Sequence, residues 1–415
     1  MSKAPGNAIA LGSVVLVLAV IGYLAFNTRS QLDYPDIEPK YEGMPKPEHQ
    51  PIYDSMNEFA FRLVEAADLG AEGGNDIIAP TSLYQNLAVL LNGAEGKTFE
   101  TLAEVIGSAG IDRIRLNEAQ NALLNRLRAM EGRPVRIANG TFFIWPIFMT
   151  NSFVDEIEGY YNADVVRLGS AGLGAVREIN VWASDRTDGV FTKVVDALSK
   201  QTVVVVINAT TVNAEWETAF NPEKTSKQTF HATGGDVAVA TLQSDGGFSV
   251  AKGDGYLAAR LPYKGGELEM TVVLPDEGVS ASNWLQTVSA ESWDSMQSRF
   301  VDRVTTLRIP RFSFKAHVDL EQAITRLGGG QLFEPKNDLR NIATELRGVE
   351  IGGIDQFSFL AVHEGAQSGS GKATNDAEDS EDLLAFDRPF AFFVSDTQTG
   401  VILLVGVVNN PAAST

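Results

Sequence analysis

The feature that most constrains this chain is an unbroken run of branched apolar residues near its middle, VVVVI at residues 203–207. A strand with one face in water alternates apolar and polar residues, whereas an unbroken run is typical of a strand buried on both faces. We therefore expect these residues in the interior of a sheet. The rest of the chain must cover both faces of that sheet.

Helical and strand-like patterns both flank this run. Apolar residues recur at spacings of three and four in four early segments, residues 55–67, 82–93, 98–106 and 115–130. Strand-like runs follow, with the pattern of a hairpin in the last two, at residues 269–274, 304–309, 391–394 and 401–408. No internal repeat is evident. The pattern predicts a single α+β domain over residues 51–415.

Composition excludes several classes of function. The 53 acidic residues against 33 Lys and Arg give a net charge of −20, which argues against nucleic-acid binding by bulk charge. The absence of cysteine removes disulfides, thiolate metal sites and cysteine nucleophiles. The 4 histidines show no pair at metal-ligand spacing. We expect no metal, no cofactor and no nucleic-acid partner.

The N-terminus carries an uncharged apolar stretch, residues 8–26. As a helix it would be about 28 Å long, close to the hydrocarbon thickness of a bilayer. We predict an N-terminal membrane anchor within residues 1–26. A cleaved signal peptide is the alternative, although no convincing small-x-small cleavage site follows the stretch.

The flanks of this stretch predict where the domain lies. Lys3 precedes it and acidic residues follow it, so the positive-inside bias places the bulk of the chain outside the cytoplasm. The protein would then be membrane-anchored and extracytoplasmic, or secreted if the stretch is cleaved. Residues 27–50 are rich in proline and poor in apolar residues, which predicts an extended linker.

Six stretches, in order, resemble the serpin family. They cover nearly all of residues 51–411 and include NDIIAPTSLYQNLAVLLNGAEGKT, LPYKGGELEMTVVLPDEG and FDRPFAFFVSDTQTGVILLVGVVNNP; in full they are residues 75–98, 179–191, 203–231, 261–278, 307–328 and 386–411. One such stretch is a weak signal. Six in the correct order and spacing are specific.

The resemblance implies a serpin fold with three β-sheets, eight or nine helices and an exposed reactive loop at about residues 363–387. It also implies a serine protease inhibitor rather than an enzyme, and we expect a monomer. In inhibitory serpins a protease cleaves the loop and is trapped as an acyl-enzyme while the loop inserts into the central sheet. The alternative is a non-inhibitory serpin-fold module that binds a partner through its acidic loop.

The first part of the loop matches the family's hinge, which joins the loop to the sheet. The hinge positions are Glu364, Gly365, Ala366, Gln367, Ser368, Gly369, Ser370, Gly371 and Lys372. With Ala366 facing inward, the inward set continues as Ser368, Ser370, Lys372 and Thr374. The small residues suit insertion, whereas burying the unpaired ammonium of Lys372 would cost several kcal/mol.

The family's spacing places the cleaved bond at Asp379–Ser380, and a count back from Pro389 gives Glu378–Asp379 instead. Five of the seven residues at 376–382 are acidic. A matching protease would need a cationic specificity pocket, as in Glu- or Asp-specific serine proteases. The alternative is a solvated acidic loop that resists proteolysis.

Four further residues match positions that govern opening of the central sheet in serpins. Ser82 matches a small polar residue beneath the sheet, and Asn208 and Trp216 match positions at its middle and top. Asp355 occupies the place of a buried histidine that is common in inhibitors. The resemblance therefore predicts that Ser82, Asn208, Trp216 and Asp355 form the sheet-opening region.

Overall fold

The computed structural model describes residues 41–413, apart from residues 72, 145–146, 162, 200–201 and 366–382. The stretch predicted as a membrane helix, residues 8–26, lies outside the described residues. Among the residues that are described, none belongs to a helix both long and apolar enough to cross a bilayer.

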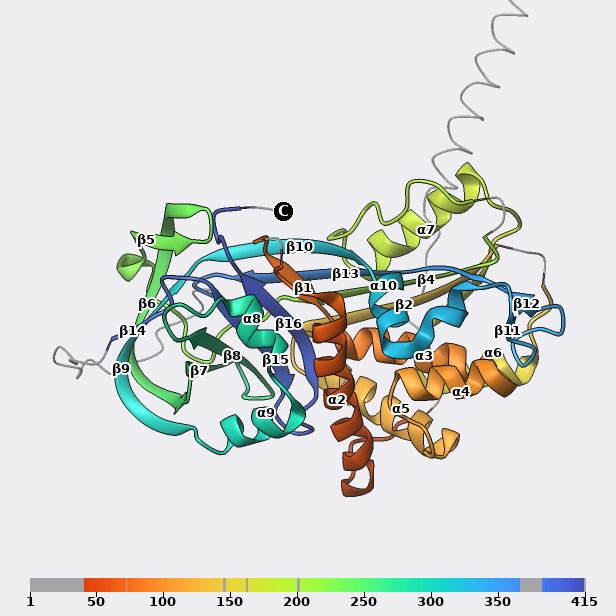
Figure 1. The fold of residues 1–415 in the computed structure, drawn as a ribbon, viewed down its shortest axis with the longest axis horizontal. Coiled ribbons are helices and arrows are strands. Elements are labelled where there is room, and N and C mark those ends of the chain that lie inside the picture. Colours follow the sequence, from red (N-terminus) through yellow and green to blue (C-terminus); the bar gives the residue numbers. More distant parts are fainter. Residues whose placement is uncertain are drawn as a thin grey trace, which may run out of the picture.

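Five helices lie together beneath the central sheet (Figure 1). They are α2 (Gln50–Ala67), α3 (Pro80–Gly93), α4 (Gly96–Val105), α5 (Arg113–Ala129) and α6 (Asn151–Tyr160). Every residue of α3 is buried, so this helix runs through the core instead of along the surface. The four helical segments predicted from periodicity are confirmed, although α2 begins at Gln50. The short helical turn η1 (Pro47–His49) precedes it, within the range predicted as linker.

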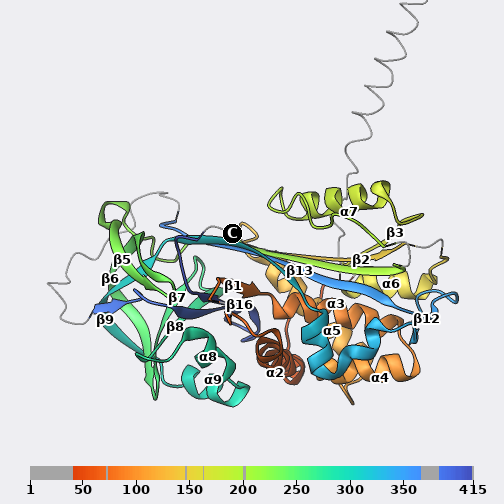
Figure 2. The same cartoon turned by 45° about the horizontal axis from the view of Figure 1, so that its top comes forward.

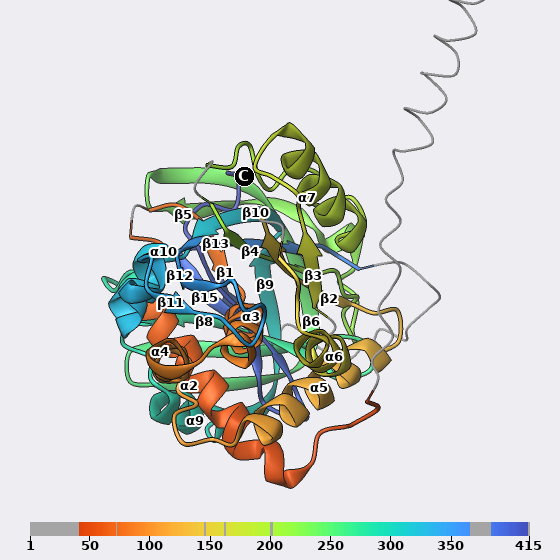
Figure 3. The same ribbon diagram turned by 90° about the vertical axis from the view of Figure 1, so that its right-hand side faces the viewer.

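The central sheet has five strands in the order β10-β13-β4-β2-β3. Their bounds are β2 (Val135–Phe143), β3 (Asp164–Arg167), β4 (Val204–Val212), β10 (Phe312–Asp319) and β13 (Ile351–Val362). β4 lies in the middle with all its residues buried, which confirms the prediction for residues 204–207, whereas Val203 lies just before the strand and is half-buried. Helix α7 (Leu173–Arg186) covers the face opposite α3, as Figures 2 and 3 show. β4 and β13 are parallel neighbours, and we call the line between them the seam.

A nine-stranded sheet forms the other half of the domain, in the order β1-β16-β15-β8-β7-β6-β9-β14, with β5 paired to β6. The hairpin predicted near the C-terminus is confirmed as β15 and β16. The strands are β1 (Asp76–Ile78), β5 (Ser226–Ala232), β6 (Gly235–Gly253), β7 (Tyr256–Pro262), β8 (Leu268–Pro275), β9 (Val301–Pro310), β14 (Leu383–Ala385), β15 (Phe390–Asp396) and β16 (Ile402–Val408).

The remaining elements are short. They are α8 (Ala281–Gln286), α9 (Ala290–Gln297), α10 (Glu321–Ile324), the helical turns η2 (Pro222–Lys224), η3 (Thr325–Gly329) and η4 (Gly330–Phe333), and the two-stranded sheet of β11 (Asn337–Asp338) and β12 (Arg347–Val349). The part of the chain described here thus holds nine α-helices, α2–α10, and three sheets, in agreement with the expected architecture.

Candidate functional site

A layer of polar side chains lies beneath the middle of the seam. Asn139, Asn208 and Gln356 are cross-strand neighbours on β2, β4 and β13, and all three are buried. From α3 below, the Ser82 hydroxyl donates to Asn139 Oδ1 at 3.0 Å, and Asn139 Nδ2 donates to Gln85 Oε1 at 3.1 Å. The structure therefore brings the predicted residues Ser82 and Asn208 to the same level of the sheet.

Gln356 closes this layer across the seam. Its Nε2 donates to Asn208 Oδ1 at 2.8 Å and to the carbonyl oxygen of Ala79 at 2.9 Å, while its Oε1 accepts from Ala79 N at 2.7 Å. One side chain thus joins β13, β4 and the start of α3. Opening the seam breaks the contact between Gln356 and Asn208.

Asp355, the fourth residue predicted for the sheet-opening region, lies on β13 at the seam but does not join the polar layer. Successive side chains of a strand point to opposite faces, and Asp355 faces away from the Gln356 side. Its carboxylate forms a hydrogen bond with Nε2 of His317 on β10, at 2.7 Å. The Asp355 side chain is 30% exposed. The His317 ring stacks on Phe357, with ring centroids 4.5 Å apart. That hydrogen bond raises the pKa of His317, against the opposing effect of burial.

Trp216 lies at the top of the seam, where β13 ends. Its indole Nε1 donates to the carbonyl oxygen of His363 at 2.7 Å, and its ring stacks on Tyr263 with centroids 4.4 Å apart. The next carbonyl, that of Glu364, accepts from Phe220 N at 3.0 Å. Trp216 and Phe220 therefore hold the two residues that follow β13.

The Glu364 carboxylate fixes the start of the predicted hinge. Its Oε1 accepts from the Arg311 guanidinium and from the Thr225 hydroxyl, the latter at 3.0 Å. Burial would raise the pKa of Glu364, but hydrogen bonds from its own backbone, Arg311 and Thr225 outweigh burial and lower that pKa. The carboxylate is thus held ionised. Gly365 follows with φ of +92°, a conformation that favours glycine.

The rest of the predicted loop lies outside the described residues. This applies to the hinge positions Ala366, Gln367, Ser368, Gly369, Ser370, Gly371 and Lys372, and to both candidate bonds, Glu378–Asp379 and Asp379–Ser380. The chain is described again from Leu383, where β14 pairs parallel to β9 within the range predicted as loop.

A segment that follows α7 covers the outer face of the seam. Phe191 is buried against Phe357 of β13, with ring centroids 5.6 Å apart, and belongs to the same apolar cluster as Ile207 and Ala209 of β4. Lys315 Nζ on β10 donates to the carbonyl oxygen of Val190 at 2.6 Å. This segment therefore packs on the face of the central sheet opposite α3.

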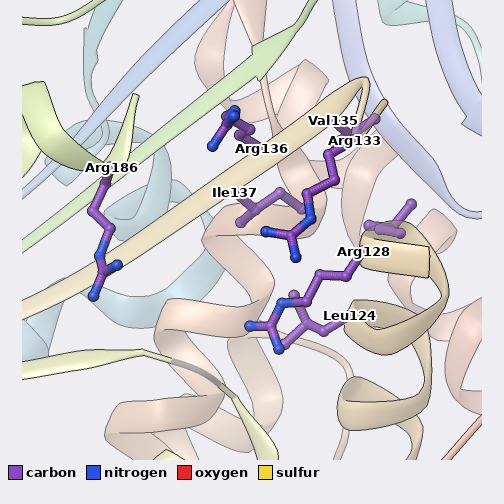
Figure 4. A pocket seen from close by; sticks show the side chains of 8 residues that line it. Leu124, Arg128, Arg133, Val135, Arg136, Ile137 and Arg186 are labelled. Atoms are coloured by element: carbon purple, nitrogen blue, oxygen red, sulfur yellow. The ribbon is translucent and has the colours of Figure 1, made fainter. Parts of the chain in front are cut away.

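Two further features of the described residues complete the description of this region. The described residues contain no cluster of three or more His, Asp or Glu side chains able to hold a metal ion. A pocket lined partly by arginines lies away from the seam, between α5, β2 and α7 (Figure 4).

Sequence reasoning missed Asn139, Arg311, Thr225 and Gln356. Gln356 had no clear signal, because Gln356 and Ser358 alternate with Phe357 and Phe359, and that pattern favours the phenylalanine face as the buried one. Arg311 lies inside a stretch that carried the family resemblance. The residues around Thr225 do not indicate its role, because its partner, Glu364, lies far along the chain.

Comparisons with known proteins agree with this geometry. The family model described as "Serpin (serine protease inhibitor)" matches residues 54–411. An uncharacterized serpin-like protein of Thermococcus kodakarensis is 28% identical, covering 90% of this chain and 88% of its own length. Serine protease inhibitor 42Dd of Drosophila melanogaster is 26% identical, covering 78% and 89%. The crystal structure of the thermophilic serpin tengpin in its native state has a TM-score of 0.80 at 21% identity, covering 91% and 98%. A family match over this much of the chain shows that the protein belongs to the serpin family.

Proposed function

We propose that this serpin inhibits a serine protease by cleavage of its reactive loop, insertion of the loop into the seam and covalent trapping of the protease. The observation that carries the proposal is the geometry at the end of β13. Glu364 and Gly365 leave that strand beside the top of the seam. A chain that turns back there can run antiparallel to both β4 and β13, and gain backbone hydrogen bonds on two sides.

The covalent step uses the chemistry of the protease. The protease serine attacks the carbonyl carbon of Asp379, the bond to the Ser380 nitrogen breaks, and that nitrogen leaves as an amine after it takes a proton from the protease's own acid. The product is an ester between the protease and Asp379. Insertion must then carry the ester away before water hydrolyses it.

The proposed target prefers acidic residues at the cleaved bond. Glu378 and Asp379 are the candidate residues, within the acidic run at 376–382. A cationic pocket on the protease would complement this run. Lys372 favours the alternative, a serpin-fold module that presents the loop without trapping, because an inward ammonium opposes insertion.

We also propose that residues 8–26 anchor the domain in a membrane and that the domain lies outside the cytoplasm. The support is the uncharged sequence of this stretch and the positive charge that precedes it. If the stretch is cleaved, the domain is secreted.

The test is incubation of the full chain with a Glu-specific serine protease, followed by denaturing electrophoresis and a melting curve of the products. Inhibition predicts a protease–serpin complex that survives boiling in detergent, and cleaved protein that melts well above the intact protein. The matched control is a Glu378→Ala, Asp379→Ala double variant, which should form less complex. Simple turnover of the loop with an unchanged melting temperature would exclude trapping and support the binding module.

A further inference from the structure

A second pocket lies between β5 and the chain that runs through β14, at the end of the domain far from α6 (Figures 1 and 2). The two segments meet where His231 N donates to the carbonyl oxygen of Asp387 at 2.7 Å, two residues beyond β14. No other backbone hydrogen bond joins them within the described residues. Between them is a volume of about 110 Å³, on the scale of one aliphatic side chain.

The edge of β5 that faces this pocket carries an unpaired backbone group. The other edge of β5 pairs with β6, and β5 has no second strand neighbour in the sheet. The N–H of His231 points away from β6, to Asp387, and alternate residues of a strand direct their N–H groups to the same side. Thr229, two residues earlier, lines the pocket, and no described residue accepts a hydrogen bond from its N–H on that side. This edge can therefore accept an added strand.

The pocket combines an apolar floor with one cation. Phe230 and Phe386 are fully buried and pack on Phe390, with ring centroids 6.4 and 5.7 Å apart. Arg308 of β9 also lines the pocket, and its Nε donates to Gln243 Oε1 at 3.0 Å. That bond orients the guanidinium, whose terminal nitrogens have no hydrogen-bond partner among the described residues. Arginine forks match the geometry of a carboxylate.

Asp387 is the one acidic residue among the described residues that line the pocket. It is exposed and lies at the end where the two segments meet. Arg308 is in register with Ala385, two residues before Asp387. An anion bound at Arg308 would therefore be attracted by one charge and repelled by the other. The two residues should have opposite effects on its binding.

We propose that this pocket binds the free C-terminus of an extended partner polypeptide. The apolar side chain of its last residue packs on Phe230 and Phe386, its carboxylate pairs with Arg308, and its backbone bonds the edge of β5 at Thr229. A neutral internal segment could use the edge and the floor but would leave Arg308 unpaired. The site is separate from the seam, and its binding does not require cleavage of the reactive loop.

The first test measures the binding of short acetylated peptides to the full chain in neutral detergent, by fluorescence anisotropy. The peptides share a stretch of alternating Thr and Ser and end in Ala, Val, Leu or Phe, each as the free acid and as the amide. At least one free acid should bind about tenfold more tightly than its amide. Equal affinities of acid and amide for every terminal residue would overturn the proposal. Butyrate bound as tightly as the best peptide would assign the pocket to small carboxylates and overturn it as well.

The second test places the carboxylate. Arg308→Gln should weaken binding of the best free acid about tenfold and remove the difference between acid and amide, whereas Asp387→Asn should tighten it. The matched control is Arg303→Gln, which removes an exposed charge from the same strand outside the pocket. An equal loss in the control would reduce the effect to net charge and contradict the assigned site.

The third test uses the unaltered chain, so it does not depend on how a substitution affects folding. With the best free acid at about ten times its Kd, hydrogen exchange at the Thr229 amide should slow about tenfold, while amides of α6 should not change. Unchanged exchange throughout β5 would exclude pairing with its edge and overturn the proposal.

Discussion

Glu364 joins the end of β13 to two distant segments through one carboxylate. Arg311 precedes β10 and Thr225 follows η2, and both donate to the same oxygen. The Glu364 side chain is 13% exposed, whereas that of Arg311 is 48% exposed. The pair is therefore partly screened by solvent, and its contribution to stability is smaller than that of a fully buried ion pair.

Replacing Glu364 with Gln should destabilise the native state by about 1 kcal/mol, since the side chain keeps its shape and loses its charge. The urea midpoint measures this, with Glu277→Gln in an exposed turn as the control. Because the pKa of Glu364 is lowered in the native state, its contribution is present above the ordinary value of 4.5 and is lost as the pH falls through the lowered pKa. A destabilisation that persists unchanged in acid would contradict this role.

The His317–Asp355 pair predicts the opposite pH dependence. The pKa of His317 is raised, so its contribution is complete below the ordinary value of 6.5 and is lost as the pH rises through the raised pKa. The side chain is about half exposed, so we expect about 0.5 kcal/mol. His317→Asn and Asp355→Asn should each remove the same part of the stability–pH curve. Curves that differ between the two variants would show that the residues do not act as a pair.

At the residue scale, Ser82 and Asn208, singled out by the family resemblance, lie in the polar layer, whereas Asp355 lies on the other face of β13 and its neighbour Gln356 joins the layer. A strand has a side-chain period of two, so an error of one residue moves a side chain to the other face of the sheet. β13 contains a register shift between Ile351 and Ile354, which makes counting along this strand unreliable. The contacts of Gln356 identify the buried position directly.

At the scale of elements, Gln356 is the residue that ties β13 to β4 and to α3. Replacing it with Leu removes its hydrogen bonds and leaves Ala79 N without its acceptor in a buried place. We expect a loss of about 2 kcal/mol in the free energy of unfolding, and faster insertion after loop cleavage. Denaturant midpoints and the rate of gain in thermal stability after cleavage measure the two effects. Asp355→Asn, on the opposite face, is the matched control and should cost less than about 1 kcal/mol; equal costs would refute the face assignment.

The elements themselves were largely predictable, because helices and strands differ in the period of their apolar residues. The four early helices and the final hairpin follow that period closely. The pairing of β4 with β13 could not be predicted from periodicity, since these strands are far apart in the chain. The segment over the outer face of the sheet was missed for the same reason: the residues around Phe191 do not indicate that it packs on Phe357, far along the chain.

For the whole molecule, the central question is whether the loop inserts fast enough to trap a protease. In the predicted register Lys372 faces the interior, where an ammonium is costly. Lys372→Thr should therefore speed insertion and raise the ratio of trapped complex to turnover, by up to about tenfold for roughly 1.4 kcal/mol of barrier. The ratio is measured on denaturing gels, with Ala373→Thr as the control on the opposite face. A larger gain for the control would show that the register is displaced by one residue.

The polar layer beneath the seam also affects how the domain should unfold under mechanical force. Thr141, Thr210 and Ser358 carry buried hydroxyls, and Asn208 a buried amide nitrogen, that have no hydrogen-bond partner among the described residues. Unpaired polar atoms make the contact between β4, β13 and α3 weaker than an apolar one of the same area. If the two halves of the domain were pulled apart in a force spectrometer, the contact between β4 and β13 should be the weakest point. The first rupture would then separate β4 from β13 while each half remained folded.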